Sequence, residues 1–327
     1  MSRLSSAPPS FLDSRGEPAY GAYEGPLPRV EFPRLGWGGR LARRKKWVYV
    51  AFVGGDVWVS ICILRTGYAA TLFAFAYDLV TGQMLVDETS IGPSLACRVS
   101  DDAHVEGELA AFRWSGAVAS MNRTASSVQV KLAMKELTVE ATVDESSGPP
   151  AIAAIGAVGE GAIDATEKRG PLDLRGFARC AGRDVTLDGG VAGYDYTHGL
   201  MPRRTTWRWG FALGKTTSGE SFALNVVQGF MGEKECAVFL GDRVLAISEP
   251  RFTFDLARPC DPWRLEADGL DLTFAPGAMH TQNTNLVLVR SRFVQPVGTF
   301  SGTLRVDGRD VVLEGVPGVV EDQDTIW

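Results

Sequence analysis

The sequence has only three histidines and no Cys-x-x-Cys pair, so it offers little for a metal centre or a disulfide framework. His104, His198 and His280 lie far apart, and the five cysteines are scattered and odd in number. We therefore expect no metal site and a reducing, cytoplasmic location. The first residues also lack the continuous apolar core of a signal peptide.

Long apolar runs and an excess of basic residues are absent as well. The most apolar region, residues 48–77, is interrupted at Gly54-Gly55-Asp56 and Arg65-Thr66-Gly67, whereas a membrane-spanning helix needs about 20 continuous apolar residues. We expect no integral membrane segment. The net charge of −6 argues against general affinity for nucleic acid. The basic run at residues 40–46 is an exception, and such a run usually forms a solvated strand edge.

The sequence also lacks the common motifs of cofactor binding and nucleophilic catalysis. It has no Gly-rich phosphate loop ahead of a helix, no G-x-S-x-G and no H-E-x-x-H. We expect no cofactor. No segment keeps a helical apolar period between two caps, so helices should be few and short.

Short aromatic and β-branched runs separated by Gly-containing turns make up most of the chain, which is typical of antiparallel β-structure. The 327 residues are 45% hydrophobic and 22% charged, a globular composition. We predict an all-β fold of antiparallel sandwiches or barrels. Residues 1–39 are rich in Pro, Gly and Ser, and we predict an arm that lies over the body or remains loose.

One segment occurs twice in the chain. Residues 176–189 and 302–315 share eight identities in fourteen ungapped positions. Each copy is followed by a Gly-containing turn and an acid, Asp195 in the first and Glu321 in the second. Hairpins of this composition also recur by chance, but a duplicated domain explains the repeat and the acids together. We predict two β domains, residues 40–196 and 197–327.

Several motifs carry a resemblance to a known family. Asp-Tyr-Thr-His-Gly at 195–199, Pro-Arg-Arg-Thr-Thr-Trp-Arg-Trp at 202–209 and Gly-Val-Val-Glu at 318–321 resemble a bacterial family named domain of unknown function 2804. More distantly, the chain is similar to the two-domain lipocalin-like proteins that include carotenoid hydratases, tocopherol cyclases and fungal pericyclases. This implies two tandem lipocalin-like β-barrels or half-open sandwiches, with the site in an apolar cavity or interface.

The residues around Asp195 supply most of the candidate site. The candidate catalytic residues are Asp195, His198 and Glu321, because a carboxyl group in an apolar site can stay protonated and a histidine can relay a proton. Asp195 is preferred as the acid. The candidate ligand-binding residues are Tyr194, Tyr196, Arg204, Trp207, Arg208, Trp209, Asn225 and Gln228. A structural ion pair between either acid and Arg183, Arg203 or Arg309 is the alternative.

Three functions remain open from the sequence. One is a cofactor-independent enzyme that hydrates, cyclises or isomerises an apolar or amphipathic small molecule by acid catalysis. A second is a non-catalytic carrier of a lipid-like ligand. The third is a structural or interaction protein in which the Trp-Arg-Trp motif and the acids lock two domains together. The oligomeric state stays open.

Overall fold

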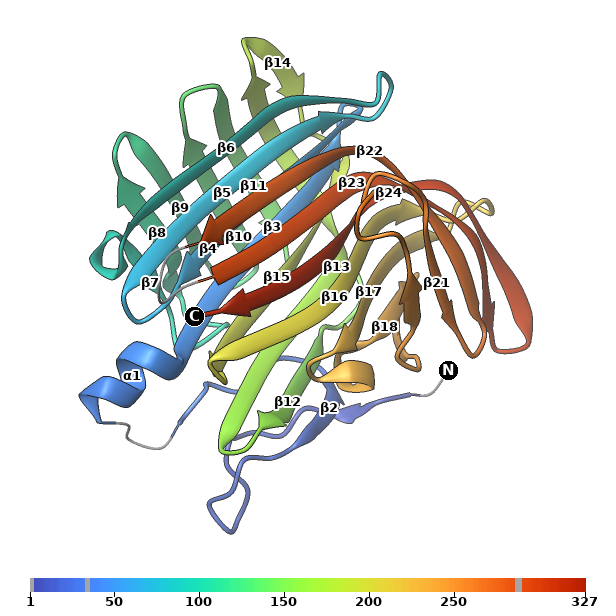
Figure 1. Ribbon diagram of the computed structural model, residues 1–327. Helices are drawn as coiled ribbons and strands as arrows, with labels where there is room; N and C mark the ends of the chain where they lie inside the picture. Colours follow the sequence, from blue (N-terminus) through green and yellow to red (C-terminus); the bar gives the residue numbers. More distant parts are fainter. Residues whose placement is uncertain (1–2, 33–35, 286–289) are drawn as a thin grey trace.

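The computed structural model describes residues 3–32, 36–285 and 290–327, and its body is built from two β-sheets (Figure 1). The first sheet is a nearly closed barrel of 15 strands, and the second is a half-barrel of nine. Within the described ranges there is one α-helix, α1 (Trp37–Arg43), with two 3₁₀ helices, η1 (Ser94–Ala96) and η2 (Gly232–Glu235). The predicted all-β fold with few short helices is confirmed.

The main path of the first sheet runs β6-β5-β4-β3-β15-β13-β11-β10-β9-β8-β7. Its strands are β3 (Arg44–Gly54), β4 (Val57–Arg65), β5 (Ala69–Asp78), β6 (Gln83–Pro93), β7 (Cys97–Val99), β8 (Gly107–Trp114), β9 (Ala117–Arg123), β10 (Ser127–Ala133), β11 (Leu137–Asp144), β13 (Ala162–Cys180) and β15 (Gly190–Leu200). Off this path, β12 (Ile152–Gly159) and β14 (Arg183–Thr186) pair with β13.

The N-terminal arm lies over the first sheet. Its strand β2 (Gly21–Glu24) pairs with β12, and the short β1 (Ser5–Ser6) pairs with β2. Phe11, Leu27 and Val30 of the arm are buried in the core of the first barrel. Of the two predicted arrangements for the arm, the structure therefore has the packed one.

The second sheet runs in the order β19-β18-β17-β16-β24-β23-β22-β21-β20. Its strands are β16 (Arg204–Lys215), β17 (Ser221–Gly229), β18 (Ala237–Leu240), β19 (Arg243–Ala246), β20 (Arg251–Thr253), β21 (Trp263–Ala267), β22 (Leu270–Asn285), β23 (Arg290–Val306) and β24 (Arg309–Ile326). In each sheet the first long strand pairs with the last, as β3 with β15 and β16 with β24. The two sheets therefore share this arrangement, in which strands from the start and the end of the segment are neighbours.

The repeated segment has the same backbone conformation in both sheets. Gly176 and Gly302 have φ angles of +134° and +138°. A Cβ added to either would approach a backbone oxygen of the neighbouring strand to 2.2 Å, so glycine is required at both positions. Ala181 and Asp307, in the two turns, also have matching left-handed φ angles of 50° and 49°.

The chain passes from the first sheet to the second between Leu200 and Arg204. The predicted division at residues 196 and 197 falls inside β15, close to this passage. That division into domains stays a prediction.

Two hydrophobic cores result, one inside the first barrel and one between the half-barrel and the outer face of the first barrel. Because side chains alternate along a strand, β3 supplies Val48 and Val50 to the first core and Tyr49 and Ala51 to the second. Burial on both faces explains why residues 48–77 are apolar almost throughout. No helix in the described residues is long and apolar enough to cross a membrane.

The basic run at residues 40–46 is not the solvated edge that we expected, because its last two lysines are buried. The Lys45 ammonium donates a 2.6 Å hydrogen bond to the Ala42 carbonyl and lies over the Trp327 ring. Lys46 donates to the Val99 carbonyl at 2.9 Å and pairs with Asp101. Burial lowers the pKa of each lysine to about 8.

Candidate functional site

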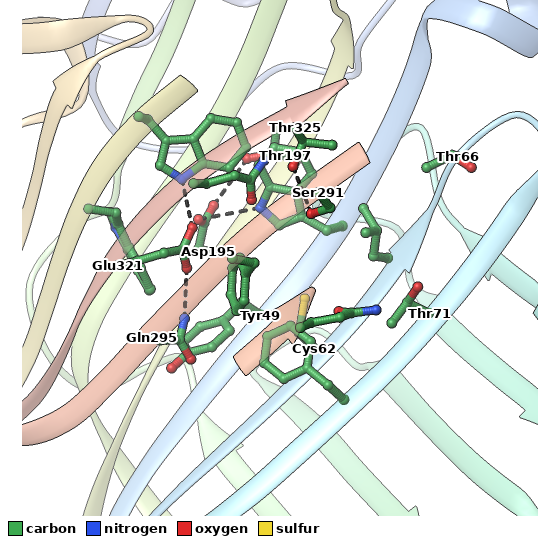
Figure 2. Close-up of a pocket in the computed structure, with 18 of the residues that line it drawn as sticks. Tyr49, Cys62, Thr66, Thr71, Asp195, Thr197, Ser291, Gln295, Glu321 and Thr325 are labelled. Carbon is green, nitrogen blue, oxygen red and sulfur yellow. Dashed lines mark hydrogen bonds between the residues drawn. The ribbon is translucent and has the colours of Figure 1, made fainter. Parts of the chain in front are cut away.

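A cavity of about 370 Å³ lies between the two sheets, within the second core (Figure 2). Large aromatic side chains from both sheets form much of its wall: Trp47, Tyr49, Phe73, Trp207, Trp209 and Phe293. The rings of Trp47 and Trp207 stack with centroids 5.8 Å apart, so the two sheets meet at this wall. An apolar cavity at a domain interface is a common place for a small-molecule site.

Asp195 and Glu321 both line this cavity, and each is 6% exposed. Figure 2 shows the two carboxyl groups in the same part of the cavity. In the first sheet Tyr49 is paired with Asp195, and in the second Trp209 is paired with Glu321. The acids therefore occupy matching positions in the two sheets.

Asp195 is held by a cation and by neutral donors. The Lys168 ammonium lies 2.7 Å from Asp195 Oδ1, and the hydroxyls of Thr166 and Thr197 donate to the same oxygen at 3.2 and 3.1 Å. The Trp47 indole donates to Oδ2 at 3.4 Å. The ion-pair alternative raised from the sequence thus applies to Asp195, although its partner is Lys168 and not one of the arginines considered.

Among the residues that the structure describes, Glu321 accepts hydrogen bonds only from neutral groups. The Trp207 indole donates to Oε1 and the Gln295 amide donates to Oε2, both at 2.7 Å. Among the described residues, no lysine or arginine forms an ion pair with this carboxyl group. Burial raises the pKa of Glu321 to about 7, and the charge of Asp195 adds to this, although the two hydrogen bonds oppose it. Glu321 is therefore a carboxyl group that is partly protonated near neutral pH.

Two further carboxyl groups, Asp164 and Glu235, line the cavity near Lys168. Glu235 Oε2 lies 3.3 Å from the Lys168 ammonium, while Glu235 Oε1 and both Asp164 oxygens have no hydrogen-bond partner among the described residues. Burial, followed by the charge of Glu235, raises the pKa of Asp164 well above its ordinary value. Burial also raises the pKa of Glu235. No group of His, Cys, Asp and Glu side chains in the described chain is placed to hold a metal ion.

Sequence reasoning missed Asp164, Lys168, Glu235 and Gln295. The sequence repeat could have identified two of them, Lys168 and Gln295. If the alignment of the two copies is extended towards the N-terminus from Gly176 and Gly302, with a gap of one residue, Lys168 aligns with Gln295. Asp164 and Glu235 have no such signal, since each is one of several charged residues in its own element, β13 and η2.

The structure places Tyr194, Tyr196 and His198 on the opposite face of β15 from Asp195, because side chains alternate along a strand. Tyr194 donates to Glu167, and Tyr196 donates to the Ser100 carbonyl at 2.9 Å. None of the three lines the cavity. The structure therefore does not bring them together with Asp195 as a proton relay.

His198 has a structural environment of its own. Its Nε2 accepts a 3.0 Å hydrogen bond from Arg44, and its ring packs edge-on against Phe32. Burial and the nearby charges of Lys46 and Arg44 lower its pKa well below the usual value. This is a neutral, buried histidine.

The remaining predicted residues surround the cavity without lining it, except for the two tryptophans of β16. Asn225 accepts from the Trp209 indole at 2.8 Å and donates to the Glu235 carbonyl at 2.7 Å, so it fixes the Trp209 ring. Arg208 points to the other face of β16, 3.3 Å from Asp322, and donates to Gln228. Arg204 forms an exposed ion pair with Asp324 at 2.7 Å.

The predicted resemblance is confirmed by a family profile, described as domain of unknown function (DUF2804), that matches residues 3–327. Among solved structures, the chain is similar to a protein described as AttH from Nitrosomonas europaea, with a TM-score of 0.54 and 12% identity over 90% of this chain and 96% of that one. It is also similar to kievitone hydratase from Nectria haematococca, with a TM-score of 0.50 and 13% identity over 100% of this chain and 98% of that one. At these identities the likeness shows the lipocalin-like fold alone. No curated protein matches the sequence.

Proposed function

The chain belongs to the family described as domain of unknown function (DUF2804), and we propose that it hydrates, cyclises or isomerises an apolar or amphipathic small molecule by acid catalysis. The observation that carries this proposal is Glu321. It is a buried carboxyl group in a largely aromatic cavity, its hydrogen-bond donors within the described part of the chain are both neutral, and burial raises its pKa to about 7. A carboxylic acid that stays protonated near neutral pH can protonate an alkene or donate to a carbonyl.

Glu321 replaces Asp195 as the preferred acid. The Lys168 ammonium lies 2.7 Å from Asp195 and forms an ion pair with it. An ionised carboxylate is suited to take a proton, either from an attacking water molecule or from a cationic intermediate. The two acids thus have opposite roles in the proposal: Glu321 gives a proton and Asp195 accepts one.

The aromatic wall suits an intermediate with cationic character. Trp47 and Trp207 each donate an indole N–H to one of the acids, so their rings are fixed beside the groups that move protons. The π faces of such rings stabilise positive charge. One of the proteins with a similar fold is named a hydratase, which supports hydration among the three reactions.

A carrier of a lipid-like molecule is the second candidate, and the volume of the cavity favours it. A space of about 370 Å³ between the sheets is large enough for a small apolar ligand. The purely structural alternative has less support, since it requires side chains to fill this interface.

Isotope labelling distinguishes an enzyme from a carrier. Purified protein is incubated with an apolar metabolite extract in ¹⁸O-labelled water and, separately, in D₂O, and the products are followed by mass spectrometry. Hydration adds one labelled water to a substrate, while cyclisation or isomerisation by protonation incorporates deuterium. The Glu321→Gln variant should lose these products, while Glu314→Gln, an exposed acid on the same strand, should keep them. If the extract yields a ligand that stays bound but is never labelled, the protein is a carrier and the enzyme proposal fails.

A further inference from the structure

Acidic side chains outnumber basic ones in the wall of the cavity. Four carboxyl groups, those of Asp164, Asp195, Glu235 and Glu321, face one ammonium group, that of Lys168. All five residues are 6% exposed or less. Burial raises the pKa values of Asp164, Glu235 and Glu321 and favours their neutral forms. If these groups ionise, one lysine cannot neutralise them all, so the cavity can take up positive charge by releasing protons.

Unpartnered oxygens inside the site point to the same conclusion. Asp164 is 1% exposed, and neither of its carboxyl oxygens has a hydrogen-bond partner among the described residues. Glu235 Oε1 is also buried without a partner. Buried polar atoms in native proteins are nearly always satisfied by protein, water or a ligand, so these oxygens leave acceptors for a polar or charged ligand group in this part of the cavity.

The rest of the wall suits a cation that is attached to an apolar group. The indoles of Trp47 and Trp207 and the ring of Tyr49 lie on the same wall as the acids, and aromatic faces attract alkylammonium groups more strongly once water is excluded. We propose that the cavity binds a positive charge carried on an apolar frame, held between these rings and the carboxyl groups of Asp195 and Glu321. The chemistry is shared by an alkylammonium ligand and by the cation that forms when an alkene is protonated. In the second form the inference rests on the proposed function.

Binding of a cation in this cavity is coupled to the protonation of Glu321 and therefore depends on the groups around it. The titratable side chains that line the cavity with it, among the described residues, are Tyr49 on β3, Cys62 on β4, Tyr68 between β4 and β5, Asp164 and Lys168 on β13, Asp195 on β15 and Glu235 in η2. Burial raises the pKa of Glu321 to about 7, and a bound cation lowers it by favouring the ionised carboxylate. Binding of a cation therefore releases protons below neutral pH.

The test compares three octyl compounds that differ in charge. Octyltrimethylammonium carries a permanent positive charge, 1-octanol is neutral and octanoate is negative near neutral pH. Binding is measured by isothermal titration calorimetry on the full chain. We expect octyltrimethylammonium to bind about tenfold more tightly than 1-octanol at about pH 8, and octanoate to bind most weakly. The affinity of octyltrimethylammonium should fall as the pH decreases below about 7, by up to about tenfold for each pH unit.

Variants locate the charge and keep the test independent of turnover. Glu321→Gln should reduce the preference for the cation and flatten its pH dependence, while Glu314→Gln should leave both unchanged. Equal affinities for the three compounds in the natural protein would overturn the inference without any variant, so an unstable variant does not weaken the test. If the protein prefers the cation but forms no labelled products in the isotope experiment, the cation-binding site is supported and the proposed enzymatic function is contradicted. If labelled products form but the protein does not prefer the cation, the cation-binding inference is contradicted and the proposed enzymatic function is not.

Discussion

Lys168 and Gln295 occupy the same position in the two sheets, each opposite the buried acid of its own sheet. Lys168 is paired with Asp195 across β13 and β15. In the second sheet, β23 pairs with β24, and Val294 lies opposite Asp322 while Val297 lies opposite Val319. Both pairs have the same register, so Gln295 lies opposite Glu321. Both side chains approach their acid to 2.7 Å.

The exchange of an ammonium for an amide at this position separates the two acids chemically. An ammonium favours the ionised carboxylate strongly, whereas an amide contributes only a neutral hydrogen bond. The two sheets thus present one acid paired with a lysine and one that, within the described ranges, has an amide in place of that lysine. This difference is the basis for assigning the proton donor to Glu321.

The pH dependence of stability tests the protonation of Glu321. Its folded pKa of about 7 lies above the ordinary value of 4.5, so between these values the folded state holds a proton that the unfolded state has lost. The free energy of unfolding should therefore decrease as pH rises from 4.5 to about 7, by up to about 3 kcal/mol from this group. Urea unfolding at several pH values measures the effect.

The matched variant for this measurement is Glu321→Gln. It should remove that part of the pH dependence, because glutamine does not titrate. The amide of Gln295 can turn over to offer its unpartnered Oε1 to the new side chain, so we expect the variant to fold. A pH profile identical to that of the natural protein would show that Glu321 ionises normally.

Much of this fold was accessible from the sequence. The Gly-containing turns and β-branched runs predicted the all-β class, which is confirmed, and the repeat of residues 176–189 predicted two related β domains, which stays a prediction. The repeat also placed Asp195 and Glu321 at matching positions. These features are local, so composition and spacing carry them.

The residues of the site were harder to predict from the sequence, because they depend on which face of each strand packs against the second sheet. The strand 190–200 is buried on both faces, so its pattern could not separate Asp195 from Tyr194, Tyr196 and His198. Lys168 and Gln295 belong to neighbouring strands whose register is fixed only by tertiary pairing. The hydrogen-bond and ion-pair partners of each carboxyl group, which only the tertiary structure brings together, favour Glu321 over Asp195 as the acid.

Replacing His198 tests whether it takes part in the chemistry. It lies on the far side of β15, where it accepts a hydrogen bond from Arg44. His198→Asn should destabilise the protein by about 1 to 3 kcal/mol, since a buried hydrogen bond is disturbed. The pH profile of labelled-product formation should keep its shape, as no step in the cavity uses this ring. A shifted profile would return His198 to the candidate catalytic residues.

Replacing Lys168 tests the charge balance of the cavity. Lys168→Met leaves Asp195 and Glu235 buried without their common counter-charge, which should cost about 3 to 5 kcal/mol of stability. The loss should be smaller at about pH 5 than at about pH 8, because protonation of the carboxyl groups relieves the unpaired charge. Lys131→Met, at an exposed position on β10, is the control and should have little effect. Equal losses at both pH values would contradict the proposed balance.

Gln295→Lys tests the difference between the two acids directly, because it gives the second sheet the arrangement that Lys168 and Asp195 have in the first. The new ammonium should form an ion pair with Glu321 and lower its pKa below about 7, since a nearby cation favours the carboxylate. The acid would then be ionised at neutral pH, so formation of labelled products should decrease there and its optimum should move to lower pH. Nuclear magnetic resonance of ¹³C-labelled glutamate carboxyl groups follows the titration without any substrate, with Gln129→Lys on the exposed face of β10 as the control. A Glu321 midpoint that stays near 7 in Gln295→Lys would mean that the residue opposite the acid does not set its protonation, and the assignment of the proton donor would lose its basis.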